Sequence, residues 1–377
     1  MSQSHLTIKK YFRKLKDPRL NRRKRHLLLD IIVIAICAVI SGSNDWQQIV
    51  TFGHSRYDWL KRFLPLPNGI PSHDTFERVF DRLDPQAFQA CFRAWMQALH
   101  EALGLCQIAI DGKTLRGSGR GDLKDLHLVS AWATANSLTL GQVAVDDKSN
   151  EITAIPKLLE LLDVHGALVT IDAMGCQKEI ADMIVERGGD FVLPVKDNQP
   201  TLHAAIQAAF EKALEHDFAG LKHDHYETAE RGHGRQETRC YDIITDPPAF
   251  DVLGWSKVRV IGMCGRERIC DEKVSTEVTY FIGSRKTTAK VYGKALRNHW
   301  GIENGLHWVL DVAFAEDNNR FSKRHGADNL AQVRRLALSL LKQHPDKSSI
   351  ACKRLRAALD PQFLEEILRI DANSENV

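Results

Sequence analysis

The chain has 377 residues, 44% of them hydrophobic and 26% charged, with a formal net charge of +3. This composition fits a soluble globular protein of two or three domains and excludes a disordered or collagen-like chain. Its eight cysteines are scattered and form no CxxC pair, which argues against a zinc ribbon or a redox motif.

Targeting segments are not expected. The first ten residues lack the apolar segment of a signal peptide. The longest apolar run, Ile31–Ile40, is shorter than the roughly 20 residues that a membrane span requires, so it predicts a buried helix. We therefore expect a cytoplasmic protein with no membrane partner and with core thiols in a reducing cytosol.

Residues 1–26 are predicted to be a basic arm. Ten Lys or Arg and a single acid, Asp17, lie between Lys9 and Arg25. Such a block predicts contact with a polyanion, although a solvated tail has the same composition. The candidate DNA-binding residues in the arm are Arg22, Arg23, Lys24 and Arg25.

Residues 27–103 are predicted to form an all-helical N-terminal domain. Leu27–Ser41 is one apolar helix, and the turn at Pro65–Gly69 precedes further amphipathic helices. Short helices behind a basic arm are compatible with helix-turn-helix DNA binding. A helical packing domain explains them equally well.

From residue 104 the pattern changes to short apolar strands. Three successive strands are followed by alternating helices and strands, which predicts an α/β domain with a mixed sheet and flanking helices. The expected strands are Gln107–Asp111, His127–Ala135, Thr139–Val145, Leu168–Asp172 and Asp190–Val195. The ribonuclease-H-like fold has this element order, and we assign it to residues 104–323.

A β-rich insertion is expected within this domain at about residues 216–286. It contains a hairpin around Gly232-His233-Gly234 and the strands Val258–Met263 and Thr276–Ile282. One helix is then predicted across Lys290–Leu310. Residues 324–377 are predicted to be a helical C-terminal tail.

Two of the predicted strands end in an aspartate. Asp111 follows the apolar run of the first strand, and Asp172 follows that of the fourth. If these strands are neighbours in one sheet, the two carboxylates meet at the same edge. They then repel each other unless a cation lies between them.

Glu303 offers a third carboxylate. On the helix predicted across Lys290–Leu310 it shares a face with His299 and His307. Three carboxylates suit Mg²⁺ or Mn²⁺, and two such ions about 4 Å apart can activate an attacking oxygen and stabilise the leaving oxygen in phosphoryl transfer. A zinc site formed by His299, Glu303 and His307 is an alternative.

Several motifs, taken together, resemble one known family. They are Asp17-Pro18-Arg19, Gly69–Phe76, Ala109–Lys113, Thr170–Gln177, Val195–Gln199 and His299–Asn304. Over nearly its whole length the chain resembles the bacterial DDE transposases of insertion sequences. The resemblance is closest to the H-repeat-associated proteins found beside Rhs elements.

The resemblance implies a DNA transposase with a ribonuclease-H-like core that cuts and joins element ends by metal-dependent phosphoryl transfer. It implies that Asp111, Asp172 and Glu303 are catalytic metal ligands and that Mg²⁺ or Mn²⁺ is the cofactor. The implied partner is double-stranded DNA, both the terminal repeats of the element and the target. A homodimer is expected at the DNA ends, associated with the nucleoid when bound.

Residues around these acids are candidates for contacts with DNA. They are Lys113, Lys196, Asn198, Arg297 and His299. The wider family places Arg at the position of His299 and Lys at that of Leu310, so Arg297, Lys290 or Arg320 is a candidate to supply the missing phosphate contact. A protonated His299 would bind phosphate, and we then expect His299→Arg to be tolerated.

Other interpretations compete with this one. Asp146, Asp147 and Glu151 form a rival acidic cluster, which we interpret as a solvated turn and helix start. Trp255 has the shape to stack on an extruded base, although core packing explains it better. A nuclease without strand transfer and a catalytically inactive or non-mobile DNA-binding relic are the alternative functions.

Overall fold

The computed structural model describes residues 7–21, 24–103, 107–119, 124–146, 149–232, 235–247, 253–270, 273–318 and 324–368. The chain forms two compact units. Unit 1 contains residues 1–105, 112–148 and 303–377, and unit 2 contains residues 106–111 and 149–302. Strand β1 (Gln107–Leu115) contributes residues to both units.

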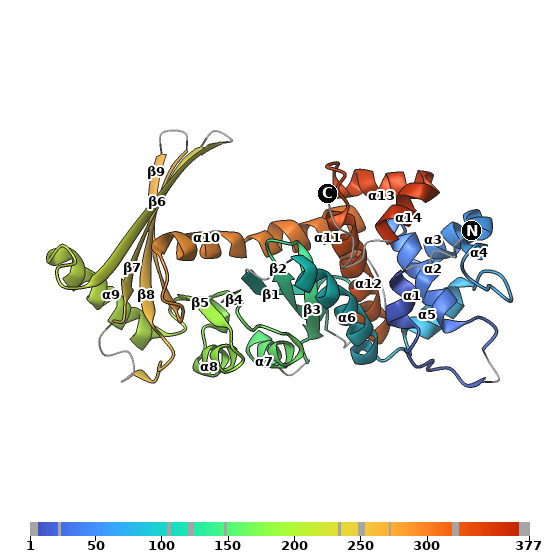
Figure 1. Cartoon of the computed structure of the whole chain (residues 1–377), viewed down its shortest axis with the longest axis horizontal. Helices are drawn as coiled ribbons and strands as arrows, with labels where there is room; N and C mark the ends of the chain where they lie inside the picture. The colour runs from blue at the N-terminus through green and yellow to red at the C-terminus, as the bar shows by residue number, and fades with distance from the viewer. Residues whose placement is uncertain are drawn as a thin grey trace. The chain divides into compact units, whose positions relative to one another are not determined.

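Unit 1 is mainly helical and contains both ends of the chain (Figure 1). Its helices are α1 (Thr7–Phe12), α2 (Leu28–Ile40), α3 (Trp46–Ser55), α4 (Tyr57–Lys61), α5 (His73–Phe80), α6 (Pro85–Leu103), α11 (Trp308–Phe314), α12 (Arg324–Gln343), α13 (Ile350–Leu359) and α14 (Pro361–Leu368). Its strands β2 (Leu126–Ala133) and β3 (Leu138–Ala144) pair in an antiparallel ladder.

Helix α2 lies at the centre of unit 1. Every residue from Asp30 to Ile40 is buried, as expected for a helix that is apolar on all sides. This confirms the prediction of a buried helix for that run. Helix α12 packs against α2 and α6, so the C-terminal segment completes the same core as the N-terminal helices. The predicted separation of residues 27–103 from a tail at 324–377 is therefore not the grouping in the structure, because local periodicity cannot reveal which helices pack together.

The start of the predicted arm is a docked helix. In α1 the side chains of Ile8 and Phe12 are buried, and the ring centroid of Phe12 lies 5.5 Å from that of Phe88 in α6. The basic residues that follow α1, such as Lys14 and Lys16, are exposed. The arm thus has a packed beginning and an exposed cationic continuation.

Unit 2 contains the parallel strands of the mixed sheet. Strand β1 pairs in parallel with β4 (Leu168–Ile171), and β4 pairs in parallel with β5 (Asp190–Val195). Helix α7 (Glu151–Leu161) precedes β4, α8 (Lys178–Glu186) connects β4 to β5, and α9 (Pro200–Glu215) follows β5. The strand order of the sheet is β3-β2-β1-β4-β5-β9-β8-β7-β6.

The predicted β-rich insertion extends this sheet. It forms four long strands, β6 (Lys222–Gly232), β7 (Arg235–Thr245), β8 (Val260–Cys270) and β9 (Lys273–Gly283). Strand β9 pairs antiparallel with β5, and each of the others pairs antiparallel with its neighbour in the chain. Figure 1 shows these strands, in yellow-green to orange, with helix α10 (Ala289–His299) alongside them.

The helix predicted across Lys290–Leu310 is interrupted. Helix α10 ends at His299, and a π-helical turn, η4, spans Glu303–His307 before α11 begins. Gly301 and Gly305 flank the start of this turn, and glycine has low helix propensity. A π turn changes the side-chain spacing, so the regular helical face that motivates the alternative zinc site is not kept between Glu303 and His307.

Within the described residues, no helix combines the length and the apolar character needed to cross a membrane.

Candidate active site

Asp111 lies within β1, which continues past its predicted end at Asp111 to Leu115, and Asp172 directly follows the neighbouring strand β4. Strands β1 and β4 are parallel, and Ile110 is the register partner of Ile171. The next residue on each strand is an aspartate, so the two side chains emerge at the same level of the sheet from strands about 4.8 Å apart. The two strands are therefore neighbours in one sheet, which is the condition set out above for the two carboxylates to lie together.

Asp172 begins the short turn η2 (Ala173–Gly175). Its carboxylate accepts a hydrogen bond from the backbone N–H of Gly175 at 3.1 Å, which fixes the side chain at the strand end. Burial raises the pKa of Asp172, the N–H of Gly175 lowers it, and the carboxylate of Glu151 raises it again. The net result is a raised pKa, as expected where negative charge is crowded and half-buried.

Glu151 is therefore closer to Asp172 than the sequence indicates. We interpret the cluster of Asp146, Asp147 and Glu151 from sequence as a solvated turn, and Asp147 lies outside the described residues. Glu151 is the first residue of α7, and α7 packs against η2 directly after Asp172. The only sequence signal for Glu151 was an acid at the start of a helix. The sequence does not reveal that this helix packs on η2, because that is a tertiary contact.

The loop after β5 lies beside the same turn. The side-chain amide of Asn198 donates a hydrogen bond to the carbonyl of Ala173 at 2.7 Å. Lys196 is exposed, and its charge lowers the pKa of Asp172. The structure thus brings Lys196 and Asn198 to the edge that carries Asp172, and Asn198 also holds the turn that follows this residue.

A buried polar network lies on the aspartate-bearing face of these strands. The amide of Gln107 donates to the hydroxyl of Thr170 at 3.2 Å and to the carbonyl of Ala295 in α10 at 2.7 Å. Alternate residues of a strand share one face, so Asp111 and Asp172 project on the face that α10 covers. Gln107 and Thr170 were not among the residues predicted from sequence, although a glutamine within an apolar strand was a usable signal.

His299, the last residue of α10, belongs to this network. Its Nδ1 lies 3.1 Å from the hydroxyl of Thr170. Burial lowers the pKa of His299 to about 4, so the imidazole is neutral near pH 7. The lowered pKa argues against a protonated, phosphate-binding histidine. Arginine would place a fixed charge at a half-buried position beside Thr170, which argues against a tolerated His299→Arg variant.

Glu303 is exposed and is the first residue of η4 in unit 1. π-Helical turns are rare and occur frequently at functional sites. The interruption places this glutamate in an irregular turn of the chain directly after α10, where a regular helix was predicted.

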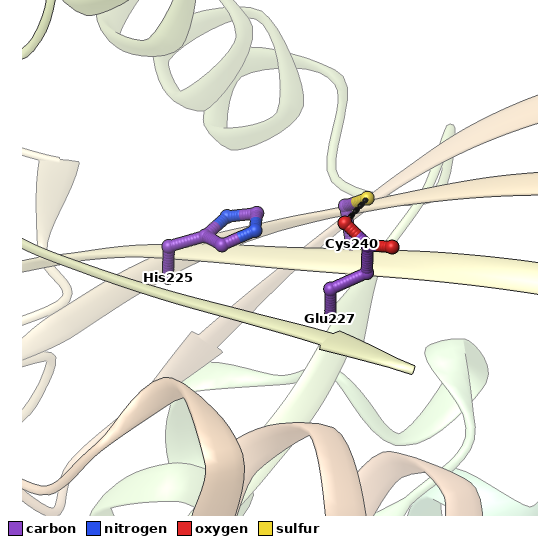
Figure 2. Close-up of side chains that lie close together, drawn as sticks. All are labelled: His225, Glu227 and Cys240. Carbon is purple, nitrogen blue, oxygen red and sulfur yellow. Dashed lines mark hydrogen bonds between the residues drawn. The ribbon is translucent and has the colours of Figure 1, made fainter. Parts of the chain in front are cut away.

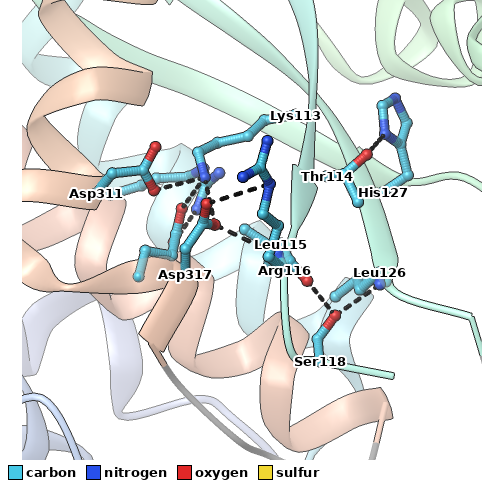
Figure 3. A network of polar contacts seen from close by, with 11 residues as sticks. Lys113, Thr114, Leu115, Arg116, Ser118, Leu126, His127, Asp311 and Asp317 are labelled. Carbon is cyan, nitrogen blue, oxygen red and sulfur yellow. Dashed lines mark hydrogen bonds and ion pairs between the residues drawn. The ribbon is translucent and has the colours of Figure 1, made fainter. Parts of the chain in front are cut away.

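Lys113 has a different environment from the one expected of a DNA contact. Its side chain is 8% exposed, and its Nζ lies 2.7 Å from Asp311, 2.9 Å from Asp317 and 3.8 Å from Glu316 (Figure 3). All four residues belong to unit 1. The ammonium group pairs with two half-buried acids and a buried one within the protein, which argues against the predicted contact of Lys113 with DNA.

Arg297 also has partners within the protein. Its guanidinium forms an ion pair with Glu230 of β6 and lies 3.8 Å from Glu237 of β7. This arrangement fastens α10 to the β6–β7 hairpin. Trp255 is 3% exposed, which agrees with core packing and not with base stacking.

Four residues of the arm were predicted to contact DNA, and two of them lie outside the described residues. Arg22 and Arg23 lie outside the described residues. Lys24 and Arg25 are exposed, and Nζ of Lys24 lies 3.8 Å from Asp17. Their contact with DNA stays a prediction.

Comparison with known proteins gives a consistent result. The family described as Transposase DDE domain matches residues 103–340, and the family described as DDE_Tnp_1-associated matches residues 9–96. The chain is 41% identical to "Putative transposase YncI" of Escherichia coli O157:H7, over 95% of this chain and 93% of that protein. It is 39% identical to "H repeat-associated putative transposase YhhI" of Escherichia coli K12, over 94% and 95%.

Among solved structures, a piggyBac transposase synaptic complex with hairpin DNA is loosely similar. The alignment covers 99% of this chain and 78% of the other, with a TM-score of 0.41 and 10% sequence identity.

Proposed function

We propose that this chain, which belongs to the DDE transposase family, cuts the ends of a mobile element and joins them to target DNA by metal-dependent phosphoryl transfer. One observation carries the proposal. The parallel register of Ile110 with Ile171 brings two aspartates to one level at the edge of the sheet, on strands that the family match includes.

The sheet supports a ribonuclease-H-like core for this chemistry. Strands β3, β2 and β1 are followed in the strand order by β4 and β5, and β1, β4 and β5 run parallel. Strands β2 and β3 are antiparallel to each other. The remaining four strands extend one edge and leave the order of the first five unchanged.

The acidic residues fit a divalent cation. Asp111 and Asp172 directly follow the register partners Ile110 and Ile171, and the raised pKa of Asp172 reflects burial and the nearby charge of Glu151, which a bound cation would offset. We assign Asp111, Asp172 and Glu303 as the residues that hold Mg²⁺ or Mn²⁺, with Glu303 assigned on its family motif. Carboxylate oxygens are the ligands these ions prefer.

The chain's own residues position the acids and the DNA. Asp172 is fixed by the N–H of Gly175, and the turn that follows it is held by Asn198. Neutral His299 holds the end of α10 against Thr170. When bound, the divalent ions supply the positive charge that stabilises the attacking and leaving oxygens of the phosphoryl group.

DNA is the proposed partner of the exposed cations. Lys196 lies at the aspartate edge, and the arm after α1 carries exposed lysines and arginines. These groups suit phosphate contacts, which position a duplex without reading its sequence. We propose that two copies act together on a pair of element ends.

The test is Mg²⁺-dependent nicking of a duplex that contains an element end. We expect Asp111→Asn, Asp172→Asn and Glu303→Gln each to abolish nicking while DNA affinity and the circular dichroism spectrum are kept. Combining them should add little, since residues that act as one unit are not additive. A supercoiled target plasmid in the same reaction reports strand transfer and separates a transposase from a nuclease.

Glu179→Gln is the matched control, because Glu179 is an exposed acid at the start of α8, in the unit that contains Asp111 and Asp172. Near wild-type nicking by any one of the three site variants would remove that residue from the ligand set. If Glu151→Gln were then inactive, Glu151 would take its place. A wild-type protein that binds ends but never nicks them would instead indicate a DNA-binding relic.

A further inference from the structure

A second group of metal-binding side chains lies on the β6–β7 hairpin, away from the aspartate edge. His225 faces Asp242 across the hairpin, and Glu227 faces Cys240. Directly opposed residues of an antiparallel pair project from the same face. The ligand atoms of His225, Glu227 and Cys240 all lie within 4.8 Å of one another (Figure 2).

These side chains occupy the face of the hairpin that α10 does not cover. The carboxylate of Asp224 accepts a hydrogen bond from the N–H of Ala289 in α10, and Tyr226 packs against the core beneath that helix. Alternation along β6 therefore directs His225 and Glu227 to the opposite face. Both are exposed and Cys240 is half-buried, so an ion can reach them from solvent.

Asp242 orients the histidine. Its Oδ1 lies 2.9 Å from Nδ1 of His225 and 2.9 Å from Nε2 of His223. A carboxylate only accepts, so Nδ1 of His225 donates and Nε2 keeps its lone pair. In Figure 2 the far edge of this imidazole points toward Cys240 and Glu227. A carboxylate behind a histidine is the usual support of a histidine that ligates a metal.

The donors are those of a borderline transition metal. An imidazole nitrogen, a thiolate and a carboxylate are three ligand types that bind Zn²⁺ at about 2.0–2.3 Å, which places tetrahedral ligand atoms about 3.3–3.8 Å apart. Sγ of Cys240 is already 3.8 Å from Oε2 of Glu227. Each atom would therefore move by less than about 1 Å to close the site.

The surroundings favour a cation and leave space for one. Glu227, Asp242 and Glu267 all lie near the thiol of Cys240. On the other side of Cys240 its register partner in β8 is Gly265, and no atom lies within 4 Å of the position that a Cβ would take there. This gap gives room for an ion and for water as a fourth ligand.

We propose that the β6–β7 hairpin binds a divalent transition-metal ion of the Zn²⁺ class through His225, Glu227 and Cys240, with Asp242 holding His225. The ion would cross-link β6, the edge strand of the sheet, to β7. Soft thiolate ligation distinguishes this site from a carboxylate site for Mg²⁺. The ion at the hairpin has a structural role, because it fastens together the strands that α10 packs against.

The test uses the untagged full-length protein with Co²⁺ as a spectroscopic probe for Zn²⁺. We expect one equivalent of Co²⁺ to produce a thiolate-to-cobalt charge-transfer band, which Zn²⁺ removes and excess Mg²⁺ does not. Cys240→Ser should abolish the band, and Cys352→Ser, which alters an exposed cysteine of α13, should keep it. Asp242→Asn should weaken Zn²⁺ binding by roughly 10- to 100-fold.

Two results would overturn the proposal: no band in the wild-type protein, or an unchanged band in Cys240→Ser. Glu227→Gln alters an exposed side chain, so it provides a second variant that keeps the fold if Cys240→Ser does not. An unchanged affinity of Glu227→Gln for Zn²⁺ would remove Glu227 from the ligands. The band should persist when Asp111, Asp172 and Glu303 are replaced together. Its loss in that variant would place the ion at those acids instead.

Discussion

Replacing Lys113 by methionine separates a structural lysine from a DNA contact. The substitution keeps most of the length of the side chain and removes its charge. Its Nζ is the shared partner of Asp311, Asp317 and Glu316, so the variant leaves three acids without their common cation. We expect the variant to be less stable and to bind DNA with an unchanged dependence on salt.

The magnitude follows from the burial of the partners. Removing one member of a buried ion pair costs about 3–5 kcal/mol, because the remaining charge stays buried. Asp311 and Asp317 keep 35% and 28% of their side-chain exposure, so water offsets part of that cost and the lower end, about 3 kcal/mol, applies. For a domain of roughly 150–250 residues this lowers Tm by roughly 6–12 °C.

The destabilisation should depend on pH. Burial raises the pKa of Asp311, the hydrogen bond and charge of Lys113 lower it, and Asp317 and Glu316 raise it. An acid whose pKa is raised by folding takes up a proton on folding, so stability falls as the pH rises through the folded-state pKa. Without Lys113 this pKa rises further. The stability gap between variant and wild type is then largest near neutral pH and narrows as the pH approaches about 4, the ordinary pKa of an aspartate.

Urea unfolding between pH 4 and pH 8 measures this gap, and DNA binding at several salt concentrations measures the contacts with phosphate. Lys14→Met is the matched control, since Lys14 is exposed in the arm. If Lys14 contacts phosphate, that variant flattens the plot of log K against log salt by about 0.9 and keeps its stability. A Lys113→Met protein of wild-type stability with a flattened salt slope would refute the structural assignment.

Three further changes test other parts of the molecule. Glu316→Gln leaves the guanidinium of Arg335, which is 2.8 Å away and fully buried, without its carboxylate. Urea unfolding should show a free energy of unfolding lower by about 3–5 kcal/mol. A decrease below about 1 kcal/mol would mean that water reaches the pair. Replacing residues 22–25 by glutamines should flatten the salt dependence of DNA binding by about 0.9 for each phosphate group that the arm no longer binds, whereas an unchanged slope would make the arm a solvated segment. Gly293→Ala builds a Cβ 2.8 Å from the ring of Tyr241, so α10 must shift. We expect stability to fall by about 1–3 kcal/mol and nicking to slow at unchanged DNA affinity. Nicking at the wild-type rate would show that the reaction tolerates this shift of α10.

The features that could be predicted from sequence are local ones. The run Ile31–Ile40 is apolar at every position, and it forms a helix that is buried on all sides. The apolar runs before Asp111 and Asp172 form strands, and the structure pairs them in parallel with Ile110 and Ile171 in register. The first of these strands continues beyond Asp111 to Leu115. In each case the signal and the structure occupy the same few residues.

The features that could not be predicted depend on partners far away in the chain. Lys113 is the last residue of the motif Ala109–Lys113, but the nearest of its acids, Asp311, is 198 residues further along. Glu151 is the start of a helix in sequence, and only the packing of α7 on η2 brings it near Asp172. Periodicity identifies an element and its buried face, and it carries no information about which other element covers that face.

Much of the long segment between Asp172 and Glu303 forms strands that pack against α10. One hydrophobic core joins Leu168 of β4 and Val192 of β5 to residues of β7, β8 and β9 and to Tyr292 of α10. Asp224 of β6 accepts from the N–H of Ala289 at the start of α10, and Glu230 of β6 pairs with Arg297 near its end.

The strands predicted as an insertion therefore build the surface on which α10 rests. Helix α10 ends at His299, four residues before Glu303, and His299 contacts Thr170 two residues before Asp172. A change in β6 or β7 that loosens α10 therefore acts on His299 and its contact with Thr170, although none of the altered residues touches Asp172. This segment is for that reason an integral part of the fold, and its removal would expose the apolar face of α10 to water.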